Sequence, residues 1–427
     1  MIALLALLLA QATPVRVLTL QEAQRVAQER QPQLRAARAS TQAAEGRVEQ
    51  SRAPLLPQLS ATGGYERTTA NYIFRPGGII RTGVIDSSWS SVNYFNSSVT
   101  LSQLLWDFGQ TSDRWRSTQA SARATADQER ATGQQILLQT RTAFFSAVAF
   151  KELLSVARET LANQHNHLVQ IEGFVQAGTR PLIDLSQARA DYANAEVQVI
   201  NAGNAYQRSK VLLNQVMGVE GPIDYDVANE ALPSEAGEDG ALGPLLENAL
   251  AARPEIAYAT EQVKAQQLLL QSARGAYGPS IAVGAGILQG TATGTNYIGW
   301  DVAAGVSFTW NLFQGLLTNG MVHEAEANIG YAVAQLDLLR QQVRVDVDQA
   351  LLAIRAAKAA LSSSRDALVA ARQRLSLAEG RYQNGSGSVI ELGDAQIAAA
   401  NAAAQVVQTD FQLATARAQL LWALGRA

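Results

Sequence analysis

The spacing of hydrophobic residues changes twice along the chain. Directly after Pro57, and again after Pro279, hydrophobic residues stand at every second position. Over most of the remaining sequence they recur at every third or fourth position. A period of two is typical of a β-strand with one apolar face, whereas the longer period is typical of an amphipathic helix. The pattern therefore predicts two regions of strand, each embedded between helices.

The clearest alternation runs over residues 297–310. Its apolar positions are Ile298, Trp300, Val302, Ala304, Val306, Phe308 and Trp310. Small and polar residues fill the positions between them. Equivalent alternation predicts strands over residues 58–68, 94–105, 280–289 and 297–310.

Each predicted strand has roughly the 9–11 residues that cross a bilayer in a transmembrane β-barrel. A soluble β-sandwich is the alternative, but the face opposite the apolar one is mostly small rather than charged, which favours membrane strands. Four strands cannot close a spanning barrel, and open strand edges are not tolerated in lipid. Membrane strands would therefore have to be shared between several chains.

Helical periodicity covers most of the rest of the chain. It predicts helices over residues 19–54, 107–172, 182–217, 245–275, 313–382 and 389–425. These segments are rich in alanine and polar residues, as long helical bundles and coiled coils are. We therefore expect a mainly α protein whose long antiparallel helices form coiled coils.

The chain is one unit of about 200 residues written twice. Pro32 and Pro254 stand in matching contexts, as do Gly178 and Gly385. We divide the chain into a first repeat over residues 13–218, a linker over 219–243 and a second repeat over 244–427. The first repeat has an insertion between its two strands, which we expect to be a long loop around Pro76.

The helix predicted over 389–425 carries two offset hydrophobic seams. One seam begins at Leu392 and the other at Ile390. A two-stranded coiled coil needs only one seam, so this helix should pack against a neighbour on each side. Helices with two neighbours each close into a tube, and we predict a helical tunnel.

The remaining face of this helix, and of its counterpart in the first repeat, is a stripe of uncharged amides. The stripe consists of Asn401, Gln405, Gln408 and Gln412 in the second repeat, and Asn194, Gln198 and Asn201 in the first. An outer solvent face is the alternative, but such faces usually mix lysine and glutamate, and lysine is nearly absent here. We therefore interpret the stripe as the lining of a water-filled tunnel.

Acidic residues gather where each stripe meets its glycine turn. Asp184 follows Gly178, while Glu391 and Asp394 follow Gly385. Ser388 to Glu391 matches a capping box, in which an acid binds a free backbone N–H, and a carboxylate in the first turn also suits the helix dipole. Together these could account for Glu391 and Asp184. They do not account for Asp394, one turn further along. In a symmetric tube these residues would form a ring of carboxylates that favours cations.

Composition removes several classes of function. Cysteine is absent, and the three histidines include His165 and His167, which we expect to be surface residues because their spacing makes a poor metal pair. A net charge of −3 gives no basic surface for nucleic acid. We find no set of residues suited to catalysis and expect neither enzymatic activity nor a cofactor.

The start, MIALLALLLAQA, predicts a cleaved signal peptide over residues 1–12 and therefore export.

These features together resemble the TolC-type outer-membrane efflux proteins over essentially the whole mature chain. The resemblance is carried by the tandem repeats, by the strand-to-helix junctions LLWDFG and NLFQG, and by the turn motifs FVQAGTRPLIDLSQA and RYQNGSGSVIELGDA. It implies a homotrimer with a shared barrel of twelve strands in the outer membrane. It also implies a periplasmic α-helical tunnel that is constricted at its inner tip.

The resemblance also implies roles for single residues. Glu391 and Asp394 fall on the acidic constriction of the family, and Tyr382 falls on its tip tyrosine. The arginine that helps to latch the closed tip of the best-known members falls on Gly387, while Arg180 holds the corresponding place in the first repeat. The arginine of the familiar latch is therefore missing from its usual place in this chain, which leaves open whether the tip is latched by salt bridges.

The function expected from this resemblance is a passive exit duct for efflux or type I secretion, working with a periplasmic adaptor and an inner-membrane transporter. The alternative is a soluble periplasmic coiled-coil scaffold or adaptor. Such a protein would use the same helices, but it would have no need of strands that face lipid.

Overall fold

The structure is a computed structural model that describes residues 16–68, 91–234, 237–292 and 299–426. The predicted signal peptide, the predicted loop around Pro76 and the first two residues of the strand predicted over 297–310 lie outside these ranges. Within the described ranges, no helix combines the length and the apolarity needed to span a membrane.

The chain folds into two compact units, and each unit contains parts of both repeats. The helical unit comprises residues up to Arg38, Asp127–Ile256 and Leu338–Ala427. The strand unit comprises Ala39–Ala126 and Ala257–Asp337. Four helices run through both units: α2 (Pro32–Arg52), α3 (Gln110–Gln176), α6 (Pro254–Gly275) and α7 (Leu317–Gln383).

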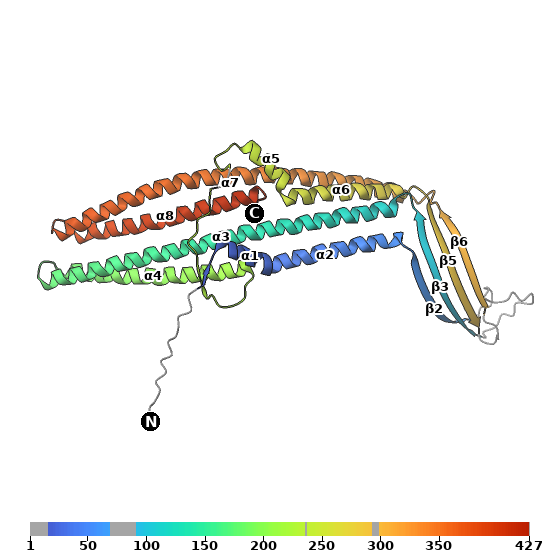
Figure 1. Cartoon of the computed structure of the whole chain (residues 1–427), viewed down its shortest axis with the longest axis horizontal. Helices are drawn as coiled ribbons and strands as arrows, with labels where there is room; N and C mark the ends of the chain where they lie inside the picture. Colours follow the sequence, from blue (N-terminus) through green and yellow to red (C-terminus); the bar gives the residue numbers. More distant parts are fainter. Residues whose placement is uncertain (1–15, 69–90, 235–236, 293–298, 427) are drawn as a thin grey trace, which may run out of the picture. The chain divides into compact units, whose positions relative to one another are not determined.

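The strand unit contains a four-stranded antiparallel sheet (Figure 1). Its strands are β2 (Gln58–Thr68), β3 (Val92–Trp106), β5 (Ser280–Ala292) and β6 (Gly299–Thr309), in the order β2-β3-β5-β6. The two repeats meet at the pairing of β3 with β5. Strands β2 and β6 therefore form the two edges of the sheet within this chain.

The register of the sheet gathers the predicted apolar residues onto one face. One row across the four strands is Ala61, Val99, Ile287 and Val302. The neighbouring row on the other face is Ser60, Thr100, Gly286 and Ala303. On the apolar face Val302, Val306 and Phe308 are 58%, 71% and 63% exposed, so the residues described by the structure leave this face uncovered.

The LLWDFG motif makes the sharp turn from β3 into α3. Phe108 and Gly109 both have left-handed backbone angles, with φ of 59° and 85°. The Asp107 side chain accepts a hydrogen bond from the Thr111 N–H at 2.8 Å and so caps the first turn of α3. The Phe108 ring packs so closely on Gly278 that a Cβ there would lie 2.2 Å from it. In the NLFQG junction of the second repeat, Gly315 has the left-handed φ of 61°.

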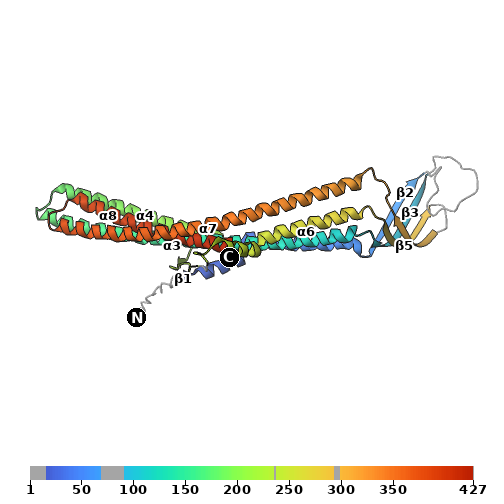
Figure 2. The same ribbon diagram turned by 90° about the horizontal axis from the view of Figure 1, so that it is seen from above.

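The helical unit contains two helical hairpins. In one, α3 turns back into α4 (Leu182–Met217), and in the other α7 turns back into α8 (Val389–Ala423), as Figures 1 and 2 show. Along α8 the first predicted seam is largely buried, with Leu392, Leu413 and Leu420 each at most 7% exposed. The second seam is buried near the end of α8 but exposed near its start, where Ile390 is 71% exposed.

Two of the predicted helices are interrupted. The helix predicted over 19–54 divides into α1 (Leu20–Arg30) and α2, and that predicted over 245–275 divides into α5 (Leu242–Ala252) and α6. The breaks fall at Gln31 and Arg253, whose extended backbone precedes Pro32 and Pro254. A proline has no N–H to donate and disfavours helical angles in the preceding residue. The predicted ranges 19–54 and 245–275 therefore each hold two helices that meet at a proline.

The segment predicted as a linker, residues 219–243, packs on the helices of the helical unit. We call its described residues, 219–234 and 237–243, the strap. It contains β4 (Tyr225–Val227), which pairs in parallel with β1 (Arg16–Leu18). Asp226 accepts hydrogen bonds from Lys151 of α3, at 2.8 Å, and from Tyr206 of α4. Further along, Glu238 is nearly inaccessible and contacts α8 and α7 through Arg417 and Lys358. The strap therefore ties the two hairpins of this unit together.

We expect the Glu238 contact to be a major source of stability of the helical unit. Arg417 donates from Nε at 3.1 Å and from Nη2 at 3.0 Å to this carboxylate, whose side chain is 3% exposed. Arg417→Gln leaves a buried charge with one partner fewer, which should lower the free energy of unfolding by about 3 kcal/mol. Unfolding in urea, followed by circular dichroism, measures the loss.

The matched control removes an exposed arginine of the same kind. Arg116 pairs with Asp113 at 3.2 Å and its side chain is 61% exposed. Arg116→Gln should change the free energy of unfolding by less than about 0.5 kcal/mol. Equal losses in the two variants would show that the strap contact adds nothing beyond a surface ion pair.

Candidate functional site

The two glycine turns close the two hairpins at one end of the helical unit. Gly178 and Gly385 have φ of 72° and 76°, which a residue with a side chain adopts only with strain. Beyond the glycines, the Thr179 N–H donates to the Phe174 carbonyl at 2.9 Å and the Ser386 N–H to the Arg381 carbonyl at 3.0 Å. These bonds satisfy the last carbonyls of α3 and α7, so the same local chemistry ends both long helices.

A small core holds the two hairpins together near these turns. Its buried residues are Ile171, Ala188, Ala378, Tyr382, Leu392 and Ala395, contributed by α3, α4, α7 and α8. Alanines at the contact positions let the helices approach closely, and the larger side chains fill the space between them. We call the region formed by this core and the two turns the tip.

Arg180 of the first hairpin binds Tyr382 of the second through a cation–π contact and a hydrogen bond. Its guanidinium lies 4.5 Å from the centroid of the Tyr382 ring, and its Nη2 donates to the Tyr382 carbonyl at 3.2 Å. The Tyr382 side chain is 1% exposed, and among the described residues its hydroxyl has no hydrogen-bond partner. The stabilising contact is therefore the ring face and the carbonyl, not the hydroxyl.

Packing around Tyr382 explains why residue 387 is a glycine. A Cβ at Gly387 would lie 2.9 Å from the Tyr382 nitrogen, which is closer than real Cβ contacts. An arginine side chain at this position would therefore push the turn apart. The cation at this place comes instead from Arg180, in the other hairpin.

His167 corrects the expectation that both histidines of its pair are surface residues. His165 is exposed, but His167 is 8% exposed, and its ring lies 5.4 Å from the Tyr382 ring in an edge-on arrangement. Burial lowers the pKa of His167, although Asp191 and Asp184 act in the opposite direction. The error arose because spacing along one helix says nothing of what packs against it from another.

Glu391 is held by its own hairpin. Its N–H donates to the Ser388 hydroxyl at 3.1 Å, which supplies the serine half of the capping box. Its carboxylate accepts a hydrogen bond from Arg381 at 2.9 Å. At the start of α4, Pro181 occupies the cap position and makes no side-chain cap. Asp184 is therefore not part of a capping box.

A groove between α4 and α8 brings the other two acids together. It has a volume of about 800 Å³, and Asp184 and Asp394 both line it, but Glu391 does not. Asn194, Gln198 and Asn401 of the predicted stripe also line it. Asn201, Gln405, Gln408 and Gln412 are exposed further along the same two helices.

The groove contains polar residues that the sequence analysis did not select as site residues. Asp191 lines it two helical turns from Asp184, at a spacing that placed it on the same stripe. Gln164 of α3 and Gln396 of α8 also line it and are joined by a hydrogen bond of 2.9 Å between buried amides. No signal in the sequence pairs these two glutamines, because they lie on different helices far apart in the chain.

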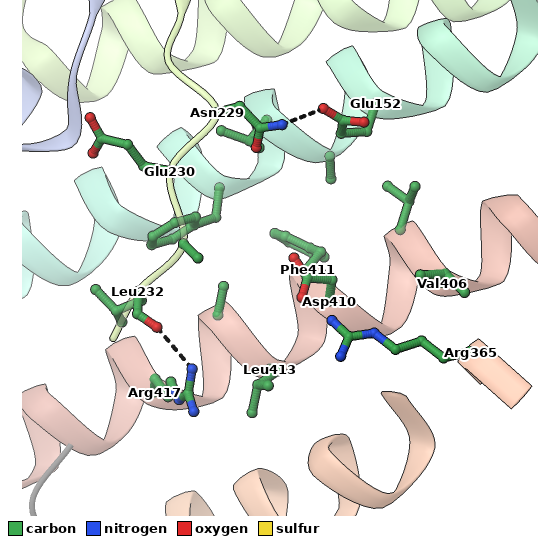
Figure 3. Close-up of a pocket in the computed structure, with 16 residues that line it drawn as sticks. Glu152, Asn229, Glu230, Leu232, Arg365, Val406, Asp410, Phe411, Leu413 and Arg417 are labelled. Atoms are coloured by element: carbon green, nitrogen blue, oxygen red, sulfur yellow. Dashed lines mark hydrogen bonds between the residues drawn. The ribbon is translucent and has the colours of Figure 1, made fainter. Parts of the chain in front are cut away.

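A second pocket, of about 300 Å³, lies where the strap crosses α3 and α8 (Figure 3). Here Glu152 accepts a hydrogen bond from Asn229 at 2.7 Å, and Arg417 donates to the Leu232 carbonyl at 2.8 Å. Its walls mix apolar side chains, Phe145 and Phe411 among them, with charged ones such as Arg365 and Asp410. The polar contacts drawn here hold the strap in place, so the groove at the tip is the stronger candidate site.

The fold and the tip define a class of protein with tandem hairpins, a sheet with an uncovered apolar face and an acidic, amide-rich groove. The family model described as "Outer membrane efflux protein" matches residues 24–219 and 245–426. This chain therefore belongs to the outer membrane efflux protein family, as the resemblance predicted.

Individual members of the family are distant in sequence but similar in fold. The chain is 24% identical over 410 residues to the outer membrane protein TolC of Escherichia coli, covering 92% of this chain and 79% of that protein. Its fold matches the crystal structure of VceC from Vibrio cholerae with a TM-score of 0.80, at 18% identity and over 95% of this chain and 96% of that one. It also matches the CmeC outer membrane channel of Campylobacter jejuni with a TM-score of 0.79, at 18% identity and over 95% and 85% of the two chains.

We expect Arg180 to hold the two turns together. Arg180→Gln removes the guanidinium from the Tyr382 ring, a contact worth about 0.5–2 kcal/mol. Amide hydrogens of residues 382–388 should then exchange with solvent about two- to thirty-fold faster, as measured by hydrogen–deuterium exchange with mass spectrometry. Tyr382→Phe is the matched control, because it removes only an unpartnered hydroxyl. Faster exchange in Tyr382→Phe but not in Arg180→Gln would contradict this assignment.

Proposed function

We propose that this protein is the passive outer-membrane exit duct of a tripartite efflux pump or type I secretion system. Substrate would enter the helical tunnel at the tip and leave through a β-barrel in the outer membrane. A periplasmic adaptor would dock at the tip, and an inner-membrane transporter would supply the energy. The duct itself would carry out no catalysis.

The sheet is the observation that carries this proposal. Among the described residues, nothing covers its apolar face and neither edge strand, β2 or β6, has a further strand partner. Lipid would cover such a face, but lipid cannot satisfy the open backbone groups of an edge strand. Three chains, each contributing four strands, would make a closed barrel of twelve, within the range of outer-membrane barrels.

The helices support a tunnel that continues from such a barrel. The amide stripes of α4 and α8 are exposed in the single chain, while the first seam of α8 is buried within it. The exposed second seam near Ile390 would then meet a neighbouring helix. With the seams covered on each side, the amides would be left facing water inside the tube.

The acids of the tip support a gate that selects for cations. In a trimer Asp394 would recur three times around one axis, together with Glu391 and the more buried Asp184. A narrow wall of low dielectric constant concentrates the field of such a ring. Because Arg381 pairs with Glu391 at 2.9 Å, Asp394 would contribute more of the unneutralised charge.

Assembly is the first test of the duct. The purified protein in detergent should be a monodisperse trimer by light scattering coupled to size-exclusion chromatography, because the edge strands are satisfied only between chains. A stable monomer that retains its β-structure by circular dichroism would contradict the shared barrel.

Conductance tests the gate. In planar bilayers we expect trimers to form pores that prefer cations. The double change Glu391→Gln and Asp394→Asn should abolish the preference, and Asp394→Asn alone should remove more of it than Glu391→Gln alone. Stability should fall by no more than about 1 kcal/mol, because a cap substitution costs about that much. Unchanged selectivity together with a lower melting temperature would assign the acids to helix capping alone.

A further inference from the structure

We infer that the groove between α4 and α8 at the tip is a binding site for an organic ammonium ion with an apolar substituent. The inference concerns one groove within each chain, not a ring of charges around the axis. It rests on the proposed function only in that the groove would open toward the path of the substrate.

The groove has the size and the walls of a small-molecule site. Its volume of about 800 Å³ lies within the range of about 300–1,000 Å³ that is usual for such sites. Isoleucines form its apolar part: Ile183 from α4, and Ile390 and Ile397 from α8. They are 74%, 71% and 60% exposed, so a ligand lying on them would remove apolar surface from water.

The charge of the groove has one sign. Asp184, Asp191 and Asp394 line it, and among the described lining residues there is no lysine, arginine or histidine. The nearby arginines are engaged elsewhere, since Arg180 stacks on Tyr382 and Arg381 pairs with Glu391. No cation of the described lining therefore neutralises the negative charge of the groove.

Two side chains of the lining, each less than a tenth exposed, carry an acceptor without a hydrogen-bond partner among the described residues. Asp184 is 8% exposed, and no described residue donates a hydrogen bond to its carboxylate. Gln164 is 7% exposed, and its Oε1 is buried without a partner, although its amide nitrogen donates to Gln396. Leaving the inaccessible Gln164 Oε1 unpaired is costly, and the Asp184 carboxylate, which keeps some access to solvent, loses less. Both acceptors could take a hydrogen bond from a ligand, because no described residue donates one to them.

A primary ammonium group satisfies these requirements together. It carries a positive charge and three N–H donors, as a lysine head group does. An alkyl or aryl substituent would cover the isoleucines. A metal ion fits less well, since no cluster of three potential His, Asp or Glu ligands occurs among the described residues, and a hydrated ion would leave the isoleucines in water.

The competing occupant is a second copy of this chain. Ile390 and Ile397 belong to the exposed seam of α8, which the proposed tunnel places against a neighbouring helix. The amine site requires that this helix leave the groove open. That occupant would supply apolar contacts but no donor for Asp184. The two possibilities differ in whether the assembled trimer still binds an amine.

Binding can be measured on the full mature protein as a trimer in lipid nanodiscs. Isothermal titration with hexylammonium, corrected by empty nanodiscs, should show saturable binding of one ligand per chain. Hexanol, which keeps the chain but lacks the charge, should bind at least tenfold more weakly. So should Mg²⁺, which keeps the charge but lacks the chain.

Variants locate the site. Asp184→Asn should weaken hexylammonium binding at least tenfold, and Asp394→Asn, at an exposed position less able to disturb folding, should weaken it by a smaller factor. Ile397→Ser tests the apolar wall and should also weaken binding. Glu172→Gln is the matched control, because Glu172 is a carboxylate of the tip that pairs with Arg189 at 3.2 Å and does not line the groove. It should leave the affinity unchanged.

Three results would overturn the site: no saturable binding by the trimer, equal binding of Mg²⁺ and hexylammonium, or equal losses in Glu172→Gln and Asp184→Asn. The first would indicate that a neighbouring copy fills the groove. Conducting trimers that do not bind the amine would refute the site and leave the duct intact. Amine binding by a protein that forms no pores would refute the duct and leave the site intact.

Discussion

The open edges of one four-stranded sheet constrain the rest of this protein. In the described part of the chain, strands β2 and β6 each present an edge without a further strand, and the apolar face between them is uncovered. Exposure of the apolar face to water is unfavourable, and so is exposure of the unpaired backbone groups of the edges to lipid. Closing several such sheets edge to edge would pair the open edges and leave the apolar face to lipid. The proposed shared barrel meets both conditions, whereas a soluble scaffold would leave the apolar face in water.

Duplication of the sequence supplies that assembly with regular parts. Each repeat gives two strands, and the copies join through β3 and β5 into one sheet. Each repeat also gives one long helix that turns back at a glycine with left-handed angles. The strap then ties the two hairpins through Asp226 and Glu238, which contact the first and second hairpin respectively. The strap thereby holds the hairpin of the first repeat and the hairpin of the second repeat together in one unit.

The tip is where the two copies have diverged. The first copy supplies Arg180 and the second supplies Tyr382, so the contact between hairpins needs one residue from each. Gly387 keeps the second turn close to Tyr382, where a side chain would not fit. The acids have diverged as well: Glu391 pairs within its hairpin, while Asp184 is buried in the groove without a hydrogen-bonding partner among the described residues. Equivalent positions in the repeats therefore have different electrostatic surroundings.

The sequence by itself determined the local elements of this fold, because periodicity, prolines and glycines act within a few residues of one another. The alternation in β6, the seam of α8 and the turns at Gly178 and Gly385 were all readable in this way. Which residues meet across helices was not readable. The burial of His167 against Tyr382, the pairing of Gln164 with Gln396 and the reach of Arg180 depend on how separate helices pack. Only the tertiary structure decided these contacts, since burial and partner choice arise between segments that the sequence lists far apart.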